Sequence, residues 1–542
     1  MKRLFSLALM LAGWAVAQPR VTGIQNNYSY LIPGTPNFAI AQGSIFVLYG
    51  TGMAPAGVLQ QGFNPALNRN LGGVSIKITV GTSTTEAIPY YVSPGQIAAI
   101  LPSATPVGTG NLTVTYNGQT SASFALTVSQ SAFGILTLGG NGLGNAAVMD
   151  LNYTLLSPTN APNPGQIVYF WGTGLGPDPN DETRLIAAPK DLTNLPFEFY
   201  IGNKLANVIY HGRSTYPGLD QLAVEIPEGI SGCYASAYAK TGNIISNFVS
   251  VPVAATGRVC ADWFSSATEV QSLLGTGRAE VNLGWFYLVR FQTWVPSIAG
   301  QAARMITQDS ATAQFLRVTP FDSSNWGSVG GFANPGCIVT SFRTQSPFTA
   351  PFLKRLDGGP AVTLTLPDGA TRTLAKVNSN YQYSQSDSTA GQNLFIPQSG
   401  GLFRFRAPGG DDVGVAEATI RADNPMVWNE HTTITSVNRS QPLTVTWRGG
   451  TPGGFVIIQG GSFTAAGDIY TSFGCTVGVE AGRFTVPRDV LASMLPSATL
   501  GGQATGQLLV EHFTLPARFT APGLDHGSIV WESYSAATVS YQ

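Results

Sequence analysis

The chain has 542 residues, of which 28 are basic and 29 acidic, so its formal net charge is −1 and charged residues are only 11% of the sequence. This balance excludes the basic field that attracts nucleic acid, and no nucleic-acid partner is expected. The 63 glycines, 35 prolines and 10% aromatic residues favour many short strands and turns and argue against disorder. The length predicts several domains.

Residues 1–17 have the organisation of a signal peptide. Lys2 and Arg3 precede an apolar stretch, and a small-x-small cleavage pattern ends at Ala17. We therefore expect an exported protein, secreted or at the cell surface, with the periplasm as the alternative. No later apolar run approaches the roughly 18 residues that a membrane helix needs, so no membrane span is expected.

A short motif occurs twice in the chain. GSIFVLYGTG at Gly43–Gly52 returns as GQIVYFWGTG at Gly165–Gly174, and alternating runs around a Gly-containing turn follow each copy. In the first copy this turn is Asn117-Gly118, a strong hairpin signal. Units of about 100 residues suit a β-sandwich. We predict one sandwich at residues 18–130 and a second, with a connector, at residues 131–260.

The Gly-Thr-Gly that closes each motif could cradle a phosphate only if a helix N-terminus followed it. The sequences that follow, MAPAGVLQQGFNPALN and LGPDPNDETRL, are rich in Pro, Gly and Asn and have no sustained 3.6-residue apolar period. We therefore predict sharp turns at the sandwich edge, and no cofactor.

Residues 261–330 are predicted to form a small α+β segment. SATE at Ser266–Glu269 is a capping box that opens a short helix ending near Leu274. Strand-like runs follow in GWFYLVRFQTW, ARMITQ and AQFLRVTP.

Alternation resumes from Cys337, and we predict one or two further β-sandwiches over residues 331–542, with residues 331–440 and 441–542 as the two units. VTLTLPDGATRTL at Val362–Leu374 and LTVTWRGGTPGGFVII at Leu443–Ile458 each suit a hairpin around a turn rich in Gly or Pro. PRDVLASML at Pro487–Leu495 suits one short helix, since proline is favoured in a first turn.

Export favours disulfides over reactive thiols for the four cysteines, whose spacing does not suit zinc. They are Cys233, Cys260, Cys337 and Cys475, and they allow three pairings. Cys233 opens the penultimate strand of the second repeat, and Cys260 follows its last strand after a turn-like segment. We predict a Cys233–Cys260 bridge, which leaves Cys337 and Cys475 as the second pair.

The sequence contains no familiar catalytic motif. Its four histidines lack helical zinc spacing, and neither HExxH nor G-x-S-x-G occurs. The acidic loops DPNDE and GGDD could hold calcium through Asp178, Asp181, Asp411 and Asp412, but neither has EF-hand spacing and turn chemistry accounts for both. We therefore expect no catalytic residue and no metal, and these four aspartates stand only as calcium candidates.

Aromatic side chains are the remaining candidates for ligand contact, because they could stack on sugar rings. Most lie in apolar or alternating runs, where core packing is the default. Trp326 is the exception, since its neighbours in FDSSNWGSVGG are polar and small. The others considered are Tyr90, Tyr91, Trp171, Trp285, Trp294, Trp447 and Trp531.

Several segments, LGGVSI, YVSPGQIAAILP, SAFGILT and NAPNPGQIVYFWGTGLGP, resemble an uncharacterised domain of many acidobacterial secreted proteins. Each half of this region also resembles the IPT/TIG immunoglobulin-like fold. The resemblance covers about residues 22–254 and lies at the N-terminal side, whereas the domain usually ends larger chains. It implies no catalytic residues. The predicted fold is all-β: tandem immunoglobulin-like β-sandwiches with a small α+β middle segment.

These features predict an exported, non-enzymatic multidomain β-sandwich protein for surface attachment or for recognition of extracellular matrix or glycan; fold alone does not fix that role. The ligand, glycan or protein, is left open. One alternative is a polysaccharide- or cell-wall-degrading enzyme whose site lies in residues 331–542. Another is a purely structural spacer.

Overall fold

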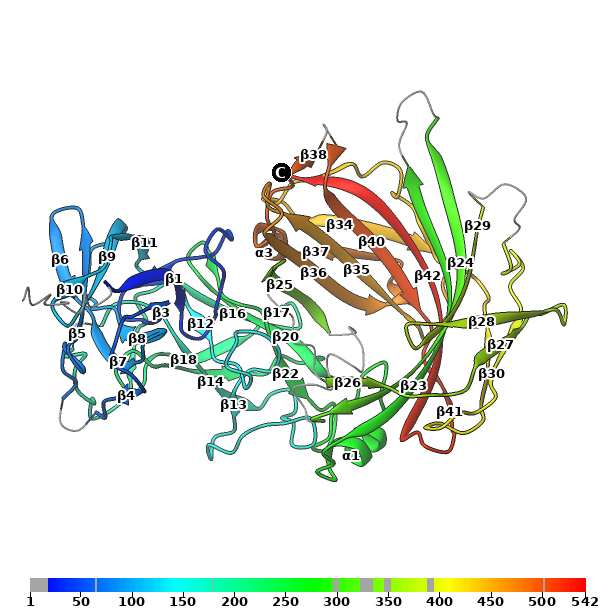
Figure 1. The fold of residues 1–542 in the computed structure, drawn as a ribbon, viewed down its shortest axis with the longest axis horizontal. Helices are drawn as coiled ribbons and strands as arrows, with labels where there is room; N and C mark the ends of the chain where they lie inside the picture. The colour runs from blue at the N-terminus through cyan, green and yellow to red at the C-terminus, as the bar shows by residue number, and fades with distance from the viewer. Residues whose placement is uncertain are drawn as a thin grey trace, which may run out of the picture.

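The structure is a computed structural model that describes residues 18–63, 66–178, 180–295, 302–321, 335–345, 352–387, 394–500 and 503–542. Figure 1 shows two small sandwiches at the N-terminal side, followed by long curved strands in the C-terminal part. The predicted leader and Trp326 lie outside the described residues. Within the described ranges, no helix combines the length and the hydropathy needed to cross a membrane.

The first repeat is a sandwich of two sheets. Its strands are β1 (Arg20–Asn26), β2 (Ile40–Ala41), β3 (Ile45–Thr51), β4 (Leu59–Gln60), β5 (Val74–Val80), β6 (Ser83–Glu86), β7 (Ile88–Val92), β8 (Gln96–Ile100), β9 (Gly108–Tyr116), β10 (Gln119–Thr120) and β11 (Phe124–Ser129). The sheet orders are β1-β3-β8-β7-β4 and β2-β11-β9-β5-β6, with β10 beside β9. Inward side chains such as Phe46, Ile76 and Val114 form one core between the sheets. As predicted, Asn117-Gly118 is a hairpin turn, with both φ angles positive (49° and 74°).

The second repeat has the same architecture. Its strands are β12 (Gly134–Ile135), β13 (Val148–Met149), β14 (Ile167–Thr173), β15 (Lys190–Asp191), β16 (Phe197–Ile201), β17 (Lys204–Leu205), β18 (Asn207–Arg213), β19 (Asp220–Glu225), β20 (Gly232–Thr241), β21 (Ile244–Ile245) and β22 (Val249–Val253). One sheet has the order β12-β14-β19-β18-β15 with β13 beside β14, and the other has β17-β16-β20-β21 with β22 beside β20. Phe170, Phe199 and Val224 lie in the core between them.

The Gly-Thr-Gly segments are sharp turns at the ends of β3 and β14. Gly52 and Gly174 follow the strands with φ angles of 62° and 101°. A side chain at Gly172 would collide with the Phe133 ring, so this glycine permits close packing of neighbouring backbone. Among the described residues that directly follow the two turns, no helix begins, so neither glycine pair faces the N-terminus of a helix there.

The predicted short helix in the middle segment is α1 (Ala267–Leu274). Its capping box is formed as expected: Ser266 Oγ accepts from the Glu269 amide at 3.3 Å, and Glu269 Oε2 accepts from the Ser266 amide at 2.8 Å. The second expected helix is α3 (Arg488–Ala492), with Pro487 as its N-cap. A 3₁₀ turn, η1 (Val479–Ala481), precedes it.

One large sheet contains most of the remaining strands. They are β23 (Val281–Val295), β24 (Arg304–Thr319), β25 (Gly336–Arg343), β26 (Phe352–Arg355), β27 (Ala361–Thr365), β28 (Thr371–Val377), β29 (Asn380–Ser386), β30 (Leu402–Ala407), β31 (Ala416–Arg421), β33 (Ser436–Val437), β35 (Phe455–Phe463), β36 (Ile469–Gly478), β40 (Gly506–Phe513), β41 (Ala517–Phe519) and β42 (His526–Tyr541). The main order is β25-β36-β35-β40-β42-β23-β24-β29-β28-β27-β30-β31. The sheet is continuous across residues 330 and 440, where domain boundaries are predicted from the sequence. Those boundaries, and the one near 260, stay predictions.

The hairpin predicted at Leu443–Ile458 is wrong. β34 (Leu443–Arg448) pairs with β32 (Val427–Trp428) and β37 (Arg483–Val486) in a separate small sheet, whereas β35 pairs with β36 and β40. Trp447 and Val456 are buried in the same core from the two sheets. Packing the two apolar runs face to face therefore outweighs pairing them edge to edge. The hairpin predicted at Val362–Leu374 is present as β27 and β28. A last short pair is β38 (Thr499–Leu500) with β39 (Gln503–Ala504).

The second repeat and the C-terminal part share cores and disulfides. Tyr238 and Phe248 of the second repeat are buried together with Trp447 of the small sheet. A disulfide joins Cys233 to Cys260, and these cysteines lie in a core that also contains residues of α1 and β23. A second disulfide joins Cys337 to Cys475. The structure thus brings the four cysteines together in the two pairs expected from the sequence.

Candidate functional site

An aromatic cleft of about 270 Å³ lies where the two repeats meet. Its lining residues are Tyr28, Ile45, Gln60, Phe63, Tyr90, Ile100, Tyr216, Pro217 and Leu219. The first repeat supplies the residues up to Ile100, and the loop 214–219 between β18 and β19 supplies the rest. Among the described residues that line the cleft, none carries a charge.

The aromatic rings of the cleft differ in exposure, and three of the four carry a hydroxyl group. Phe63 and Tyr216 contact edge to face, with their centroids 5.4 Å apart, and Tyr216 is 46% exposed. Tyr28 and Tyr90 are half-buried, and burial raises the pKa of Tyr28 to about 12 and moves the pKa of Tyr90 in the same direction. Both phenols are therefore protonated and can donate hydrogen bonds at neutral pH.

Thr173 connects the two repeats beneath the cleft. Its Oγ1 accepts a hydrogen bond from the Ile45 amide at 2.8 Å and donates one to the Gly218 carbonyl at 2.5 Å. Asn26 adds a second connection, because its Nδ2 donates to the carbonyl oxygens of Ala132 and Thr173. Buried hydrogen bonds of this kind fix the two walls of the cleft relative to each other.

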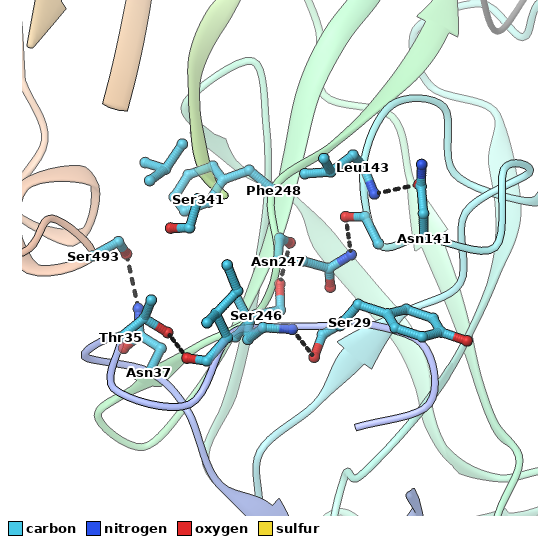
Figure 2. Close-up of a pocket in the computed structure, with 15 residues that line it drawn as sticks. Ser29, Thr35, Asn37, Asn141, Leu143, Ser246, Asn247, Phe248, Ser341 and Ser493 are labelled. Carbon is cyan, nitrogen blue, oxygen red and sulfur yellow. Dashed lines mark hydrogen bonds between the residues drawn. The ribbon is translucent and has the colours of Figure 1, made fainter. Parts of the chain in front are cut away.

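A smaller pocket of about 60 Å³ lies where the N-terminal loop, the second repeat and the C-terminal part meet (Figure 2). Its polar groups already bind one another: Asn37 Nδ2 donates to Ser493 Oγ at 2.9 Å, and Asn247 Nδ2 donates to the Gly142 carbonyl at 2.9 Å. The remaining volume has room for a few water molecules only. We interpret this pocket as a joint between three segments of the chain.

The structure gives the carboxylates of Asp178, Asp181 and Asp412 partners within the protein, and Asp411 is bonded through its backbone amide. Asp178 accepts a hydrogen bond from Lys190 Nζ at 2.8 Å, and Asp181 accepts one from the Thr183 amide at 3.0 Å. In the other loop, Asp412 Oδ2 accepts from the Asp357 amide at 2.9 Å, and the Asp411 amide donates to the Asp357 carboxylate at 3.1 Å. In the part of the chain that the structure describes, no group of three or more His, Cys, Asp and Glu side chains could hold a metal ion.

Of the aromatic candidates named from the sequence, the structure places Tyr90 in the cleft. Trp285, Trp447 and Trp531 are buried in cores, and Tyr91, Trp171 and Trp294 are half-buried outside the cleft lining. Sequence reasoning missed Tyr28, Phe63 and Tyr216. Phe63 in QGFNP and Tyr216 in STYPG have small or polar neighbours, which is the criterion that selected Trp326. Applied along the whole chain, that criterion would have found both.

A second group of side chains lies on one face of the large sheet. Glu511 in β40 is directly opposite Tyr534 in β42, and Phe513 is opposite Glu532, so the two glutamates are diagonal neighbours. Both carboxyl groups are half-buried, and burial raises the pKa of Glu511 to about 7 and that of Glu532 to about 8. Gln459 Nε2 donates to Glu511 at 3.1 Å. Sequence reasoning missed this pair because strand register brings it together.

Residues 35–129 match the family model of the IPT/TIG domain, so the first repeat contains an IPT/TIG immunoglobulin-like domain. No curated protein matches the sequence.

The solved structures that match this chain do so at low similarity. Gamma-CGTase from alkalophilic Bacillus clarkii is 9% identical with a TM-score of 0.16, and the match covers 51% of this chain but only 34% of the CGTase chain. SGBP-B from a complex xyloglucan utilization locus of Bacteroides uniformis is 12% identical over 68% of this chain and 86% of that chain, with a TM-score of 0.15. The Yersinia pseudotuberculosis adhesin InvE is 15% identical over 39% and 56%, with a TM-score of 0.12. These likenesses carry no functional argument.

Proposed function

We propose that the chain is an exported, non-enzymatic recognition protein that binds a neutral glycan in the cleft between its two N-terminal repeats. The observation that carries this proposal is the composition of the cleft: four aromatic rings, phenol hydroxyls and one amide, with no charged side chain among the described lining residues. The leader-like residues 1–17, the two disulfides and the resemblance of residues 22–254 to acidobacterial secreted proteins support export.

The chemistry of the cleft favours a sugar over other ligands. A pyranose ring has an apolar C–H face and a polar hydroxyl edge, so it can pack on an aromatic ring while its hydroxyls bond to phenols and amides. A charged ligand would lose hydration in the cleft without gaining an ion pair. Because Tyr216 is 46% exposed, the cleft is open at one side and suits one unit of an extended polymer.

The test is calorimetric titration of the full chain with neutral oligosaccharides, namely cellohexaose, xylohexaose and mannohexaose. We expect at least one to bind, and Tyr216→Ala to weaken that binding by about ten-fold or more. Tyr153→Ala is the matched control, since Tyr153 is also an exposed tyrosine of the second repeat (56%) but lies outside the cleft lining. No binding by a cooperatively melting chain, or equal losses in both variants, would contradict the proposal.

Glycan hydrolysis by the C-terminal sheet is a second candidate function, and the Glu511–Glu532 pair favours it. Diagonal neighbours in an antiparallel ladder have Cβ atoms roughly 7 Å apart. This is comparable to the separation of about 5 to 9.5 Å between the two carboxyl groups of glycosidases. Carboxyl groups with raised pKa values are also what a general acid needs near neutral pH.

Incubation of the full chain with the same three oligosaccharides, followed by chromatography of the products, distinguishes the two candidates. Hydrolysis that Glu532→Gln abolishes and Asp411→Asn leaves unchanged would establish the enzyme. The absence of products across pH 5 to 8, together with binding that depends on Tyr216, would support the recognition protein.

A further inference from the structure

The loop that carries Tyr216 is closed at its base by a buried ion pair. Arg213 ends β18, Asp220 begins β19, and the two residues are directly paired in the ladder. Arg213 Nη1 lies 2.6 Å from Asp220 Oδ1, and the residues are only 2% and 0% exposed. The chain between them, residues 214–219, forms the second-repeat wall of the cleft.

The same ion pair is anchored to the turn that follows β14. Arg213 Nη2 donates to the Gly176 carbonyl at 2.9 Å, and Asp220 Oδ2 accepts from the Leu175 amide at 2.8 Å. Further hydrogen bonds of this kind help a buried pair to keep its geometry. The base of the loop is therefore fixed to the Gly-Thr-Gly turn.

The tip of the loop is held by the first repeat. Gly218, with a φ angle of 72°, packs so closely that a side chain there would come within 2.7 Å of Ile45 Cγ1 and 3.2 Å of Ile100 Cγ1. Its carbonyl accepts the Thr173 hydrogen bond described above. The loop is thus restrained both at its base and at its tip, with Tyr216 between the two restraints.

Building on the proposed glycan-binding function, we infer that Arg213 and Asp220 are positioning residues of the cleft: their ion pair fixes the 214–219 loop so that Tyr216 meets Phe63 across the junction. Neither residue lines the cleft, so both act through the loop. Removing one charge leaves the other buried without its partner, and the loop must shift to let water reach it.

The position of the Tyr216 ring can be followed without any ligand. We would incorporate 3-fluorotyrosine at Tyr216 in the full chain and record its ¹⁹F resonance, which is sensitive to the adjoining Phe63 ring. Phe63→Leu calibrates the shift that loss of this contact produces. Asp220→Asn keeps the shape and an acceptor for the Leu175 amide but removes the charge. We expect its resonance to move toward that of Phe63→Leu.

Asp309→Asn is the matched control, because Asp309 forms a comparable buried ion pair with Arg290, at 2.8 Å, in the large sheet. It should lower stability and leave the Tyr216 resonance unchanged. If Asp220→Asn fails to fold, Arg213→Lys is the alternative variant. It disturbs the ion pair less, because it keeps the positive charge but loses the guanidinium group that binds both Asp220 and Gly176. A Tyr216 resonance that stays unchanged in whichever of these two variants folds would overturn the inference.

Binding of the three oligosaccharides separates this inference from the proposed function. Asp220→Asn should weaken the binding of whichever oligosaccharide binds the wild-type chain by about ten-fold, and undiminished affinity would overturn the inference. If none of the three oligosaccharides binds while the resonance still moves in Asp220→Asn, the glycan proposal fails and the positioning role stands.

Discussion

Cys337 in β25 lies directly opposite Cys475 in β36, and a disulfide joins the two residues across 138 positions of the sequence. β25 is the terminal strand of the large sheet, and within the described residues β36 is its ladder partner. The bridge therefore fixes an edge strand that, among the described strands, is paired along one side only, with β36.

Removal of the Cys337–Cys475 bridge should lower the free energy of unfolding more than removal of the Cys233–Cys260 bridge. By the loop-entropy relation, Cys337→Ser with Cys475→Ser lowers the free energy of unfolding by roughly 5 kcal/mol, and Cys233→Ser with Cys260→Ser, which are 27 positions apart, by roughly 3.5 kcal/mol. Denaturant titration under non-reducing conditions measures both values. Equal losses would show that the bridges do not stabilise the protein mainly by restricting the unfolded chain.

Stability should fall as the pH rises above 7, because of Glu511 and Glu532. Burial raises their folded-state pKa values to about 7 and about 8, so the folded chain binds protons that the unfolded chain has released. Their stabilising contribution is complete below pH 4.5 and is lost as the pH passes 7 to 8. Asp220 and Asp262, whose pKa values burial raises to about 6, act in the same direction. At lower pH, His512 and His526, whose pKa values burial lowers to about 4, act in the opposite direction.

The expected fall in the free energy of unfolding between pH 7 and pH 9 is about 2 kcal/mol. Chemical denaturation at several pH values measures it, and Glu532→Gln should remove a large part of the slope. Glu417→Gln is the control, since this glutamate pairs with Arg404 at the exposed end of the sheet. A free energy of unfolding that does not change with pH in the wild-type chain would contradict the claim that burial raises the pKa values of Glu511 and Glu532.

A fragment of residues 18–260 should fold but should also self-associate. Both sandwich cores lie within it, so we expect a cooperative melt. Tyr238, Ile245 and Phe248 lose the C-terminal side chains that cover them, which leaves an exposed apolar patch. Sedimentation and dye binding should therefore differ from those of the full chain. A fragment without a cooperative melt would show that the boundary near residue 260 is misplaced.

Gly172 should tolerate no side chain. A Cβ atom there would collide with Phe133, so Gly172→Ala should destabilise the second repeat by about 1 to 3 kcal/mol. Gly62→Ala is the control, because a Cβ atom at Gly62 would enter open space. Melting curves should show the loss in the first variant only.

Phosphate should stabilise neither the variants nor the parent chain, since irregular loops follow the Gly-Thr-Gly turns.

Local patterns in the sequence were enough for many elements of this fold. Ser266 and Glu269 are three positions apart, so their capping box depends only on helix geometry, and α1 starts where that box predicts. The Asn117-Gly118 turn also follows from local backbone preference, because both residues tolerate positive φ. Hydrophobic alternation likewise indicated the strands and the all-β class.

Tertiary structure decided which runs face one another. Trp447 and Val456 belong to one alternating stretch, yet they cover a common core from two different sheets. The cleft depends on a similar choice, since Phe63 and Tyr216 come from different repeats and meet only where the sandwiches join. Strand register places Glu511 beside Glu532 in the same way. The physical reason is that the hydrophobic effect is non-directional: a sequence shows which side chains must be buried, and only the packed chain determines what covers them.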